Sequence, residues 1–271
     1  MNIFKFEAKR LLKSCLTWAL VCGFTIALFM AFFPSMRDSG IQELVETKLG
    51  AFPEGLLEAF GINEMVDFTD IIQYEAYVLQ YIGMATAIYG LILGVGSLLD
   101  EEKEGSIEFL YAQPVSRYEI VTYKALSRAI VYLVFMVIVA FATMVISMIY
   151  KPADLKTIEM LIDIKEIFIG LTLAGYIFLS IGLFLSTVLK PSYNSVAISI
   201  GVFFISYIFG VLSKMKDKLD YFRYLSPFDY AMPMNIVKEG WNWSFVALGL
   251  LTIMVSIIGT YMIYGKKDLW S

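Results

Sequence analysis

The side chains best placed to do chemistry lie in a polar run at residues 100–123, between two long apolar segments. If the first half of this run is helical, Glu101, Glu104 and Glu108 fall on one face, and apolar side chains fall near the opposite face. This two-faced pattern indicates an element that docks on a partner protein. The residues alone leave open a second interpretation, a solvated loop between two membrane helices.

The ends of this docking element are predicted by local backbone signals. Gly105 weakens or bends the first helix, and Pro114 ends it, because the residue before a proline avoids the α conformation. Ser116 and Glu119 then fit a capping box, in which each side chain accepts a hydrogen bond from the backbone amide of the other residue. The next helix is therefore expected to begin at Arg117 and to continue into the membrane.

The chain contains no histidine, which removes the usual general base, the usual zinc ligand and the usual activator of a serine nucleophile. No segment has the glycine-rich pattern with a lysine that cradles the phosphates of ATP. The serine, tyrosine and cysteine side chains have no activating partner that the sequence indicates. We therefore assign no catalytic residue, no metal site and no cofactor to this chain.

Apolar segments long enough to span a membrane lie on both sides of the polar run and hold it at the membrane surface. Hydrophobic residues make up 59% of the chain, its mean hydropathy is +0.71, and apolar stretches of about 20 residues recur along it. Such segments must be helices, because a bilayer offers no partner for backbone polar groups. We predict an all-α polytopic protein with a single domain, residues 1–271, and six spans, at residues 14–33, 77–99, 129–149, 167–189, 196–212 and 245–264. None of these spans contains Asp, Glu, Lys or Arg, which disfavours a proton-coupled antiporter.

The orientation follows from lysine and arginine residues near the ends of the spans. Six crossings place both termini on one side, and cations near both termini identify that side as the cytoplasm; they are Lys5, Lys9, Arg10, Lys13, Lys266 and Lys267. The pattern is not uniform, since five cations fall in residues 213–242, on the predicted outer side. We expect a multi-pass protein of the plasma membrane with both termini in the cytoplasm.

Two longer segments are predicted on the outer side. Residues 34–76 hold nine acidic residues against two basic ones, and residues 53–61 within them fit a short amphipathic helix between a proline and a glycine. Residues 213–244 are interrupted by two prolines and a glycine and are rich in aromatic residues, which is typical of a membrane interface.

The order of these features resembles the permease subunits of ABC transporters of the second permease type, which have the type V exporter fold. Four pieces carry the resemblance over nearly the whole chain: residues 52–62 before the second span; residues 102–117 with Lys124; Tyr-Leu-Ser-Pro-Phe-Asp-Tyr at 224–230; and Lys-Lys-Asp-Leu at 266–269. The second piece contains the glutamates of the polar run, an apolar patch at 109–111 and the sequence Pro-Val-Ser-Arg.

In that family, the cytoplasmic element between the second and third spans, here residues 100–118, is a coupling helix that fits a groove on a separate ATP-binding subunit. The resemblance implies that this contact is formed or shaped by eight residues: Glu101, Glu102, Glu104, Gly105, Glu108, Pro114, Ser116 and Arg117. ATP and Mg²⁺ would then be bound by the partner subunit. A second permease subunit, identical or related, and an outward path for cargo between the two permeases are also implied.

The resemblance implies two further elements. Residues 1–13, with apolar side chains on one helical face and lysines on the other, are similar to the interfacial elbow helix of the family, although a basic flank of the first span would have the same pattern. Residues 213–244 would form short re-entrant helices on the outer side. The apolar spans favour an amphipathic or hydrophobic cargo such as a peptide, a lipid-like molecule or a drug, and no nucleic acid partner is expected.

Two other function classes stay open on the residues alone. A self-contained channel or secondary carrier would need no ATPase and would tolerate the loss of the acidic face. A membrane anchor or sensor would recruit a cytoplasmic partner through residues 100–117 without moving a cargo.

Overall fold

The computed structural model describes residues 3–37, 66–104, 116–215 and 217–266. Within these ranges the chain forms helices joined by turns, with no β-strand. Six of the helices are long and apolar enough to cross a membrane. They are α1 (Ile3–Met30), α5 (Ile71–Glu104), α7 (Arg117–Tyr150), α8 (Thr157–Val188), α9 (Ser195–Met215) and α11 (Trp243–Tyr264). The predicted all-α fold with six membrane helices is therefore confirmed.

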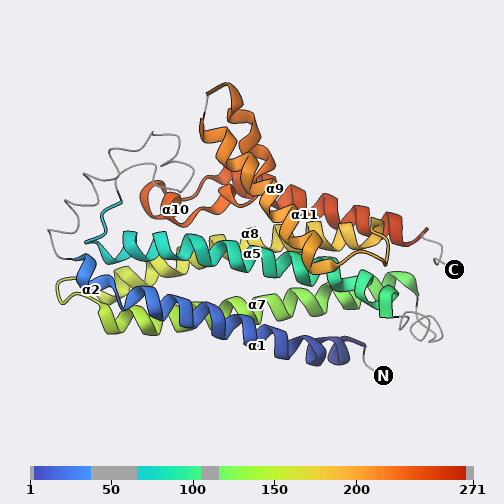
Figure 1. Ribbon diagram of the computed structural model, residues 1–271, viewed down its shortest axis with the longest axis horizontal. Helices are drawn as coiled ribbons and strands as arrows, with labels where there is room; N and C mark the ends of the chain where they lie inside the picture. The colour runs from blue at the N-terminus through green and yellow to red at the C-terminus, as the bar shows by residue number, and fades with distance from the viewer. Residues whose placement is uncertain (1–2, 38–65, 105–115, 216, 267–271) are drawn as a thin grey trace.

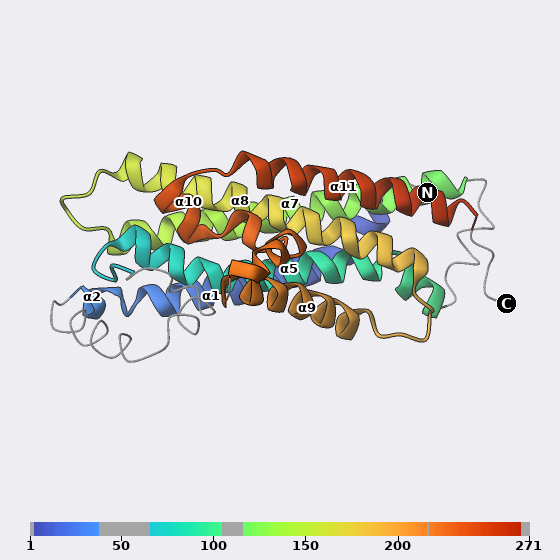
Figure 2. The same cartoon turned by 90° about the horizontal axis from the view of Figure 1, so that it is seen from above.

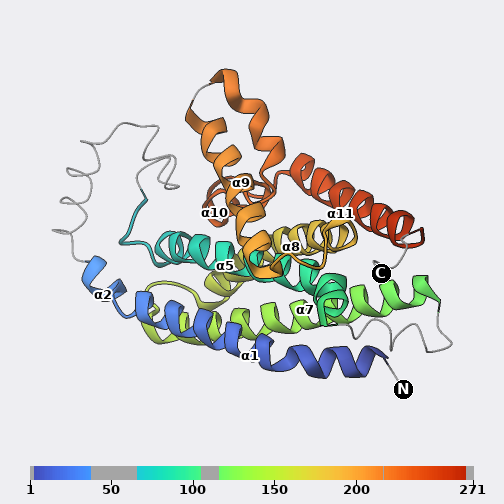
Figure 3. The same ribbon diagram turned by 45° about the vertical axis from the view of Figure 1, so that its right-hand side comes forward.

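Most of the long helices lie side by side in an elongated bundle. α5 packs along α8, α1 packs along α7, and α11 lies against α8 (Figures 1 and 2). α9 contacts α5 and then leans away from the bundle (Figure 3). Both termini, the end of α5 and the start of α7 lie at one end of the bundle, which we call the terminal end (Figure 1). The opposite end carries the short helix α2 (Phe33–Met36).

Short helices form the segment between α9 and α11. They are the 3₁₀ helices η1 (Asp217–Leu225) and η2 (Asp229–Ala231) and the helix α10 (Pro233–Glu239). η2 and α10 lie against the middle of the bundle, on α8 and α5, and Gly240 ends α10 with a φ of 77°. Their entry into a membrane from the outside stays a prediction. The amphipathic helix predicted at residues 53–61 lies outside the described residues.

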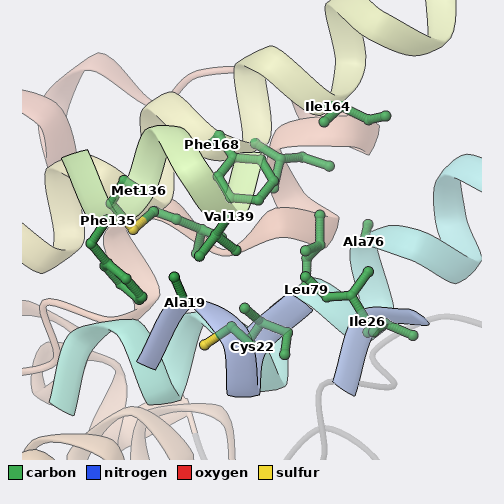
Figure 4. Close-up of a cluster of buried hydrophobic side chains, with 14 of the residues drawn as sticks. Ala19, Cys22, Ile26, Ala76, Leu79, Phe135, Met136, Val139, Ile164 and Phe168 are labelled. Atoms are coloured by element: carbon green, nitrogen blue, oxygen red, sulfur yellow. The ribbon is translucent and has the colours of Figure 1, made fainter. Parts of the chain in front are cut away.

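Apolar side chains from α1, α5, α7 and α8 form the main core. Figure 4 shows side chains of the four helices meeting between the ribbons, among them Cys22, Leu79, Val139 and Phe168, all of which are buried. The outward faces of α1, α9 and α11 instead expose large apolar side chains such as Leu20, which a bilayer would cover.

The helices extend beyond the predicted spans at both ends of the bundle. Residues 3–13 are the first turns of the unbroken helix α1, so no elbow helix separate from the first span is present in the described residues. The added turns also carry buried charged side chains, namely Glu7 on α1, Glu75 on α5, and Lys124 and Arg128 on α7. The predicted spans themselves contain no charged residue, but the whole helices do, because the apolar limits mark only the central part of each one.

Candidate functional site

The predicted docking residues lie where α5 ends and α7 begins, at the terminal end (Figure 1). α5 remains helical past the predicted limit of its span. The eight residues fall into three groups: Glu101, Glu102 and Glu104 in the last turn of α5; Gly105, Glu108 and Pro114 outside the described residues; and Ser116 and Arg117 at the start of α7. A coupling helix between α5 and α7 therefore stays a prediction, while the start of α7 can be described in detail.

The capping box at the start of α7 is present as predicted. Ser116 Oγ accepts a hydrogen bond from the backbone N–H of Glu119 at 3.2 Å, and Glu119 Oε2 accepts one from the backbone N–H of Ser116 at 2.7 Å. Two amides that the helix leaves without partners are thereby satisfied. α7 begins at Arg117, as the sequence predicts, and its first turn is held in a defined conformation.

Contacts with α11 hold the first turns of α7 in place. The rings of Tyr118 and Tyr261 stack at 6.2 Å between centroids. The Thr122 hydroxyl donates to the carbonyl of Tyr118 at 2.7 Å, so the Tyr261 hydroxyl donates the hydrogen bond that joins it to Thr122 Oγ1, also 2.7 Å long. The start of α7 is therefore braced against the last membrane helix.

A buried ionic cluster, which we define as Glu7, Lys124 and Arg128, lies just inside the terminal end. Arg128 Nη1 donates to Glu7 Oε2 at 3.0 Å, and Lys124 Nζ lies 3.6 Å from Glu7 Oε1. Both cations also bind carbonyls of α5. Arg128 Nε donates to Leu93 O at 3.0 Å, and Lys124 Nζ and Arg128 Nη2 donate to Ser97 O at 3.0 and 3.3 Å.

This ionic cluster joins three helices through charged side chains that are buried away from water. The side chains of Glu7, Lys124 and Arg128 are only 2%, 1% and 4% exposed. Burying a charge costs several kcal/mol, which good geometry and further hydrogen bonds must offset. A shift of α7 relative to α1 or α5 would break these contacts and leave a buried charge without a partner. The ionic cluster therefore favours movement of the three helices as one unit at this end.

The ionic cluster was not predicted as a site from the sequence. Lys124 entered only as part of the family resemblance, and Glu7 and Arg128 were not selected. One signal was available, because Lys124 and Arg128 are four residues apart and so share a face of a helix. Their common partner could not be found, since Glu7 is more than a hundred residues away along the chain.

Polar contacts hold the segment between α9 and α11 against α9 and α8. Lys214 Nζ lies 2.9 Å from Asp229 Oδ1, and Trp241 Nε1 donates to Glu166 Oε2 at 2.7 Å. The Tyr230 hydroxyl donates to the carbonyl of Tyr224 at 2.5 Å. Burial and, to a smaller extent, the Asp229 carboxylate raise the pKa of Tyr230 to about 12, so this hydroxyl keeps the proton that it donates.

A cavity of about 350 Å³ lies between α1 and α5 at the opposite end of the bundle. Its lining is aromatic and aliphatic, with Thr25, Phe29, Phe32, Met36, Phe68, Tyr74, Tyr77, Val78, Tyr81 and Ile82. The hydroxyl of Tyr74 donates to Phe29 O, that of Tyr81 donates to Tyr77, and that of Thr25 donates to Val21 O. The cavity therefore offers mainly apolar surface. Within the described ranges, no group of three or more acidic or cysteine side chains could hold a metal ion.

The chain matches the model of a known protein family. The family model described as ABC-2 family transporter protein matches residues 1–269 of the chain. A search of curated proteins found no match. The family match covers all six membrane helices and both sides of the candidate site.

Proposed function

The chain belongs to the ABC-2 family of transporter proteins, and from this premise we propose that it is the permease of an ATP-driven exporter, which docks a separate ATPase at the terminal end of its bundle. The family identifies the chain as a multi-pass membrane subunit of an ABC transporter and not as the ATPase. In the proposed complex, ATP and Mg²⁺ bind to the ATPase subunit. Two permease subunits, identical or related, form the path for the cargo.

The observation that carries this proposal is the connection between the capped start of α7 and the buried ionic cluster. Ser116 and Glu119 fix the first turn of α7, and Lys124 and Arg128 bind α1 and α5 from the next turns of the same helix. Rigid elements joined by hydrogen bonds and ion pairs are suited to carry a displacement between distant sites. A push from an ATPase on the residues before Ser116 would then move three membrane helices together.

The cargo that we propose is amphipathic or hydrophobic. The cavity between α1 and α5 supports this proposal, because six aromatic rings line it and most of its hydroxyl groups already have partners. Its volume of about 350 Å³ lies in the range of small-molecule sites. A polar ion would find few groups there to replace its hydration shell, whereas an apolar chain or ring would be well covered.

We place the terminal end of the bundle in the cytoplasm of a cell whose plasma membrane holds the protein. The support comes from the cations of the first turns of α1, with Lys9, Arg10 and Lys13 close to the N-terminus, since such residues are retained on the cytoplasmic side. This orientation presents the end of α5 and the start of α7 to a cytoplasmic ATPase.

The proposal is tested by purifying the chain in mild detergent from its native membrane and identifying the proteins that accompany it. We expect a P-loop ATPase with the native chain and its loss with Glu104→Lys, which reverses a charge on the predicted docking face. Asp154→Lys is the matched control, because Asp154 is exposed in the turn between α7 and α8, at the opposite end. Retention of the ATPase and unchanged transport by Glu104→Lys would contradict the proposal and favour a self-contained carrier or a sensor.

A second pair of variants separates docking from coupling. Ser116→Ala removes the cap of α7 and should lower cargo-stimulated ATP hydrolysis several-fold in complexes that still contain the ATPase. Ser116→Asp retains a side-chain cap and should preserve that stimulation. Equal stimulation in both variants would show that the cap does not contribute to coupling.

A further inference from the structure

A second buried charged residue, Glu75, lies near the start of α5 at the opposite end of the bundle. The residue is 1% exposed. Its Oε1 lies 2.5 Å from the hydroxyl oxygen of Ser147 on α7, while its Oε2 has no hydrogen-bond partner. No ion pair within the described residues includes Glu75. The carboxyl group thus lies inside a membrane bundle without a cation to balance a negative charge.

The surroundings of Glu75 are apolar. Its neighbours Ile72, Ala76 and Leu79 belong to the main core, as do Ile26 of α1 and Ile164 of α8. Figure 4 shows Ala76 and Leu79 close to Ile26. The cations near this end have other partners: Arg37 pairs with Asp154, Lys151 donates to Pro152 O, and Lys165 pairs with Glu166. The acidic groups there have the same sign as an ionised Glu75; they are Asp70, which caps α5, and Glu159 and Asp163 on α8. The hydroxyl of Tyr74 donates to Phe29 O.

The hydrogen bonds around Ser147 indicate that the Glu75 carboxyl group is neutralised by a proton. Ser147 Oγ also lies 2.8 Å from the carbonyl oxygen of Thr143, which can only accept. A hydroxyl has one hydrogen, so if Ser147 gives it to Thr143, then Glu75 must supply the hydrogen of the other contact. A protonated carboxyl group can do so, and it also removes the need for a counter-ion in an apolar site.

We propose that Glu75 is a proton-binding site: in the folded protein at neutral pH it holds a proton, donates a hydrogen bond to Ser147 and thereby links α5 to α7. The site is distinct from the ionic cluster at the terminal end, and the proposal does not depend on the proposed function. It makes the contact between α5 and α7 at the opposite end dependent on pH.

The sign of the pH dependence follows from proton counting. In the unfolded chain an ordinary glutamate loses its proton at about pH 4.3. Above that pH the folded protein binds one proton more than the unfolded chain at this position. Stability therefore falls as pH rises, and the loss continues until the folded protein also releases the proton.

The test measures the midpoint of thermal unfolding of the full chain in detergent as a function of pH. Relative to the Glu75→Gln variant, the native protein should lose about 3 °C for each pH unit above about pH 5. Gln keeps the volume and stays neutral, so its profile should lack this slope. Glu159→Gln is the matched control, because Glu159 is exposed on α8 at the same end and should leave the slope unchanged. Parallel profiles of the native protein and Glu75→Gln would overturn the proposal.

A spectroscopic measurement gives an independent readout. Infrared spectra at neutral pH should contain the carbonyl stretch of a protonated carboxyl group, which Glu75→Gln removes and Ser147→Ala shifts. Replacing Na⁺ by choline in the buffer should change neither the band nor the unfolding midpoint. Absence of the band would overturn the proton assignment. Stabilisation of the native protein by Na⁺ that Glu75→Gln abolishes would also overturn it and would assign the site to a small metal cation.

Discussion

The charged side chains of this protein act in different ways according to their burial. The pair between Lys156 and Glu159 is exposed to solvent and is worth little, because water screens it. Glu7, Lys124 and Arg128 are buried, and Glu7 balances the charge of both cations while Arg128 also donates to the carbonyls of Leu93 and Ser97. Removing one member of such a cluster is costly, since the groups that it bonded are left in an apolar interior. The ionic cluster is therefore the place where single substitutions should have the largest effect.

Arg128→Met tests this difference between buried and exposed charges. The variant removes donors to Glu7 and to the carbonyls of Leu93 and Ser97, and it should lower the free energy of unfolding by about 3–5 kcal/mol. Unfolding in mixed micelles, followed by circular dichroism, measures the change. Lys156→Met is the control and should leave the midpoint within error. Equal effects of the two substitutions would show that the ionic cluster contributes no more than a surface pair.

At the level of helices, glycine residues decide how closely α5 and α8 approach. A Cβ atom on Gly90 would lie 2.7 Å from the carbonyl oxygen of Gly175, and one on Gly182 would lie 2.8 Å from that of Leu91. Such contacts with backbone atoms cannot be relieved by turning a side chain. The spacing Gly-x-x-x-Gly at Gly90 and Gly94 is typical of helices that pack closely, and the structure places α8 against both. A third glycine of α8, Gly170, does not face α5. It contacts Ala231 of η2 and Ile236 of α10.

Gly94→Ala should therefore destabilise the bundle. Its Cβ would lie 2.8 Å from the Cα of Gly182, so the two helices must separate, at a cost of about 1–3 kcal/mol. The unfolding midpoint in detergent measures the loss. Gly201→Ala is the control, because a Cβ there meets no atom within 4 Å and alanine favours a helix. A stable Gly94→Ala variant would mean that α5 and α8 can pack in another way.

For the whole molecule, the arrangement of the helices places three features together at the terminal end. These are both termini, the end of α5 with the predicted docking residues, and the start of α7 (Figure 1). The cavity and Glu75 lie towards the opposite end. A permease with this arrangement would receive force on one side of the membrane and respond along the length of the bundle. The orientation of the bundle then decides which compartment each end faces.

Labelling with a maleimide that cannot cross membranes tests the proposed orientation. Asp154→Cys, at the opposite end, should react in intact cells, whereas Lys9→Cys should react only after the membrane is permeabilised. The background should be low because Cys15 and Cys22 are buried. Mass spectrometry of the purified protein measures both reactions. Labelling of Lys9→Cys alone in intact cells would invert the orientation and place the docking residues outside the cell.

The sequence by itself determined the features that depend on neighbouring residues. The length and apolarity of each segment predicted six membrane helices, and the spacing of Ser116 and Glu119 predicted the start of α7. Both signals act within a few turns of the chain, so no knowledge of packing is needed to read them. The family resemblance, based on residues along the whole chain, was confirmed by the family match at residues 1–269.

Only the tertiary structure decided the features that join distant residues. Glu7 meets Arg128, and Glu75 meets Ser147, across separations of 121 and 72 residues. A charged residue near a span has the same local pattern as a solvated flank until its partner helix is known. For this reason Glu75 was assigned to an acidic outer segment, and the burial of Glu7 was not predicted. A charged group can be buried only if other polar groups replace the water that it loses. In this bundle those groups lie on neighbouring helices, so the sequence near the charge does not reveal them.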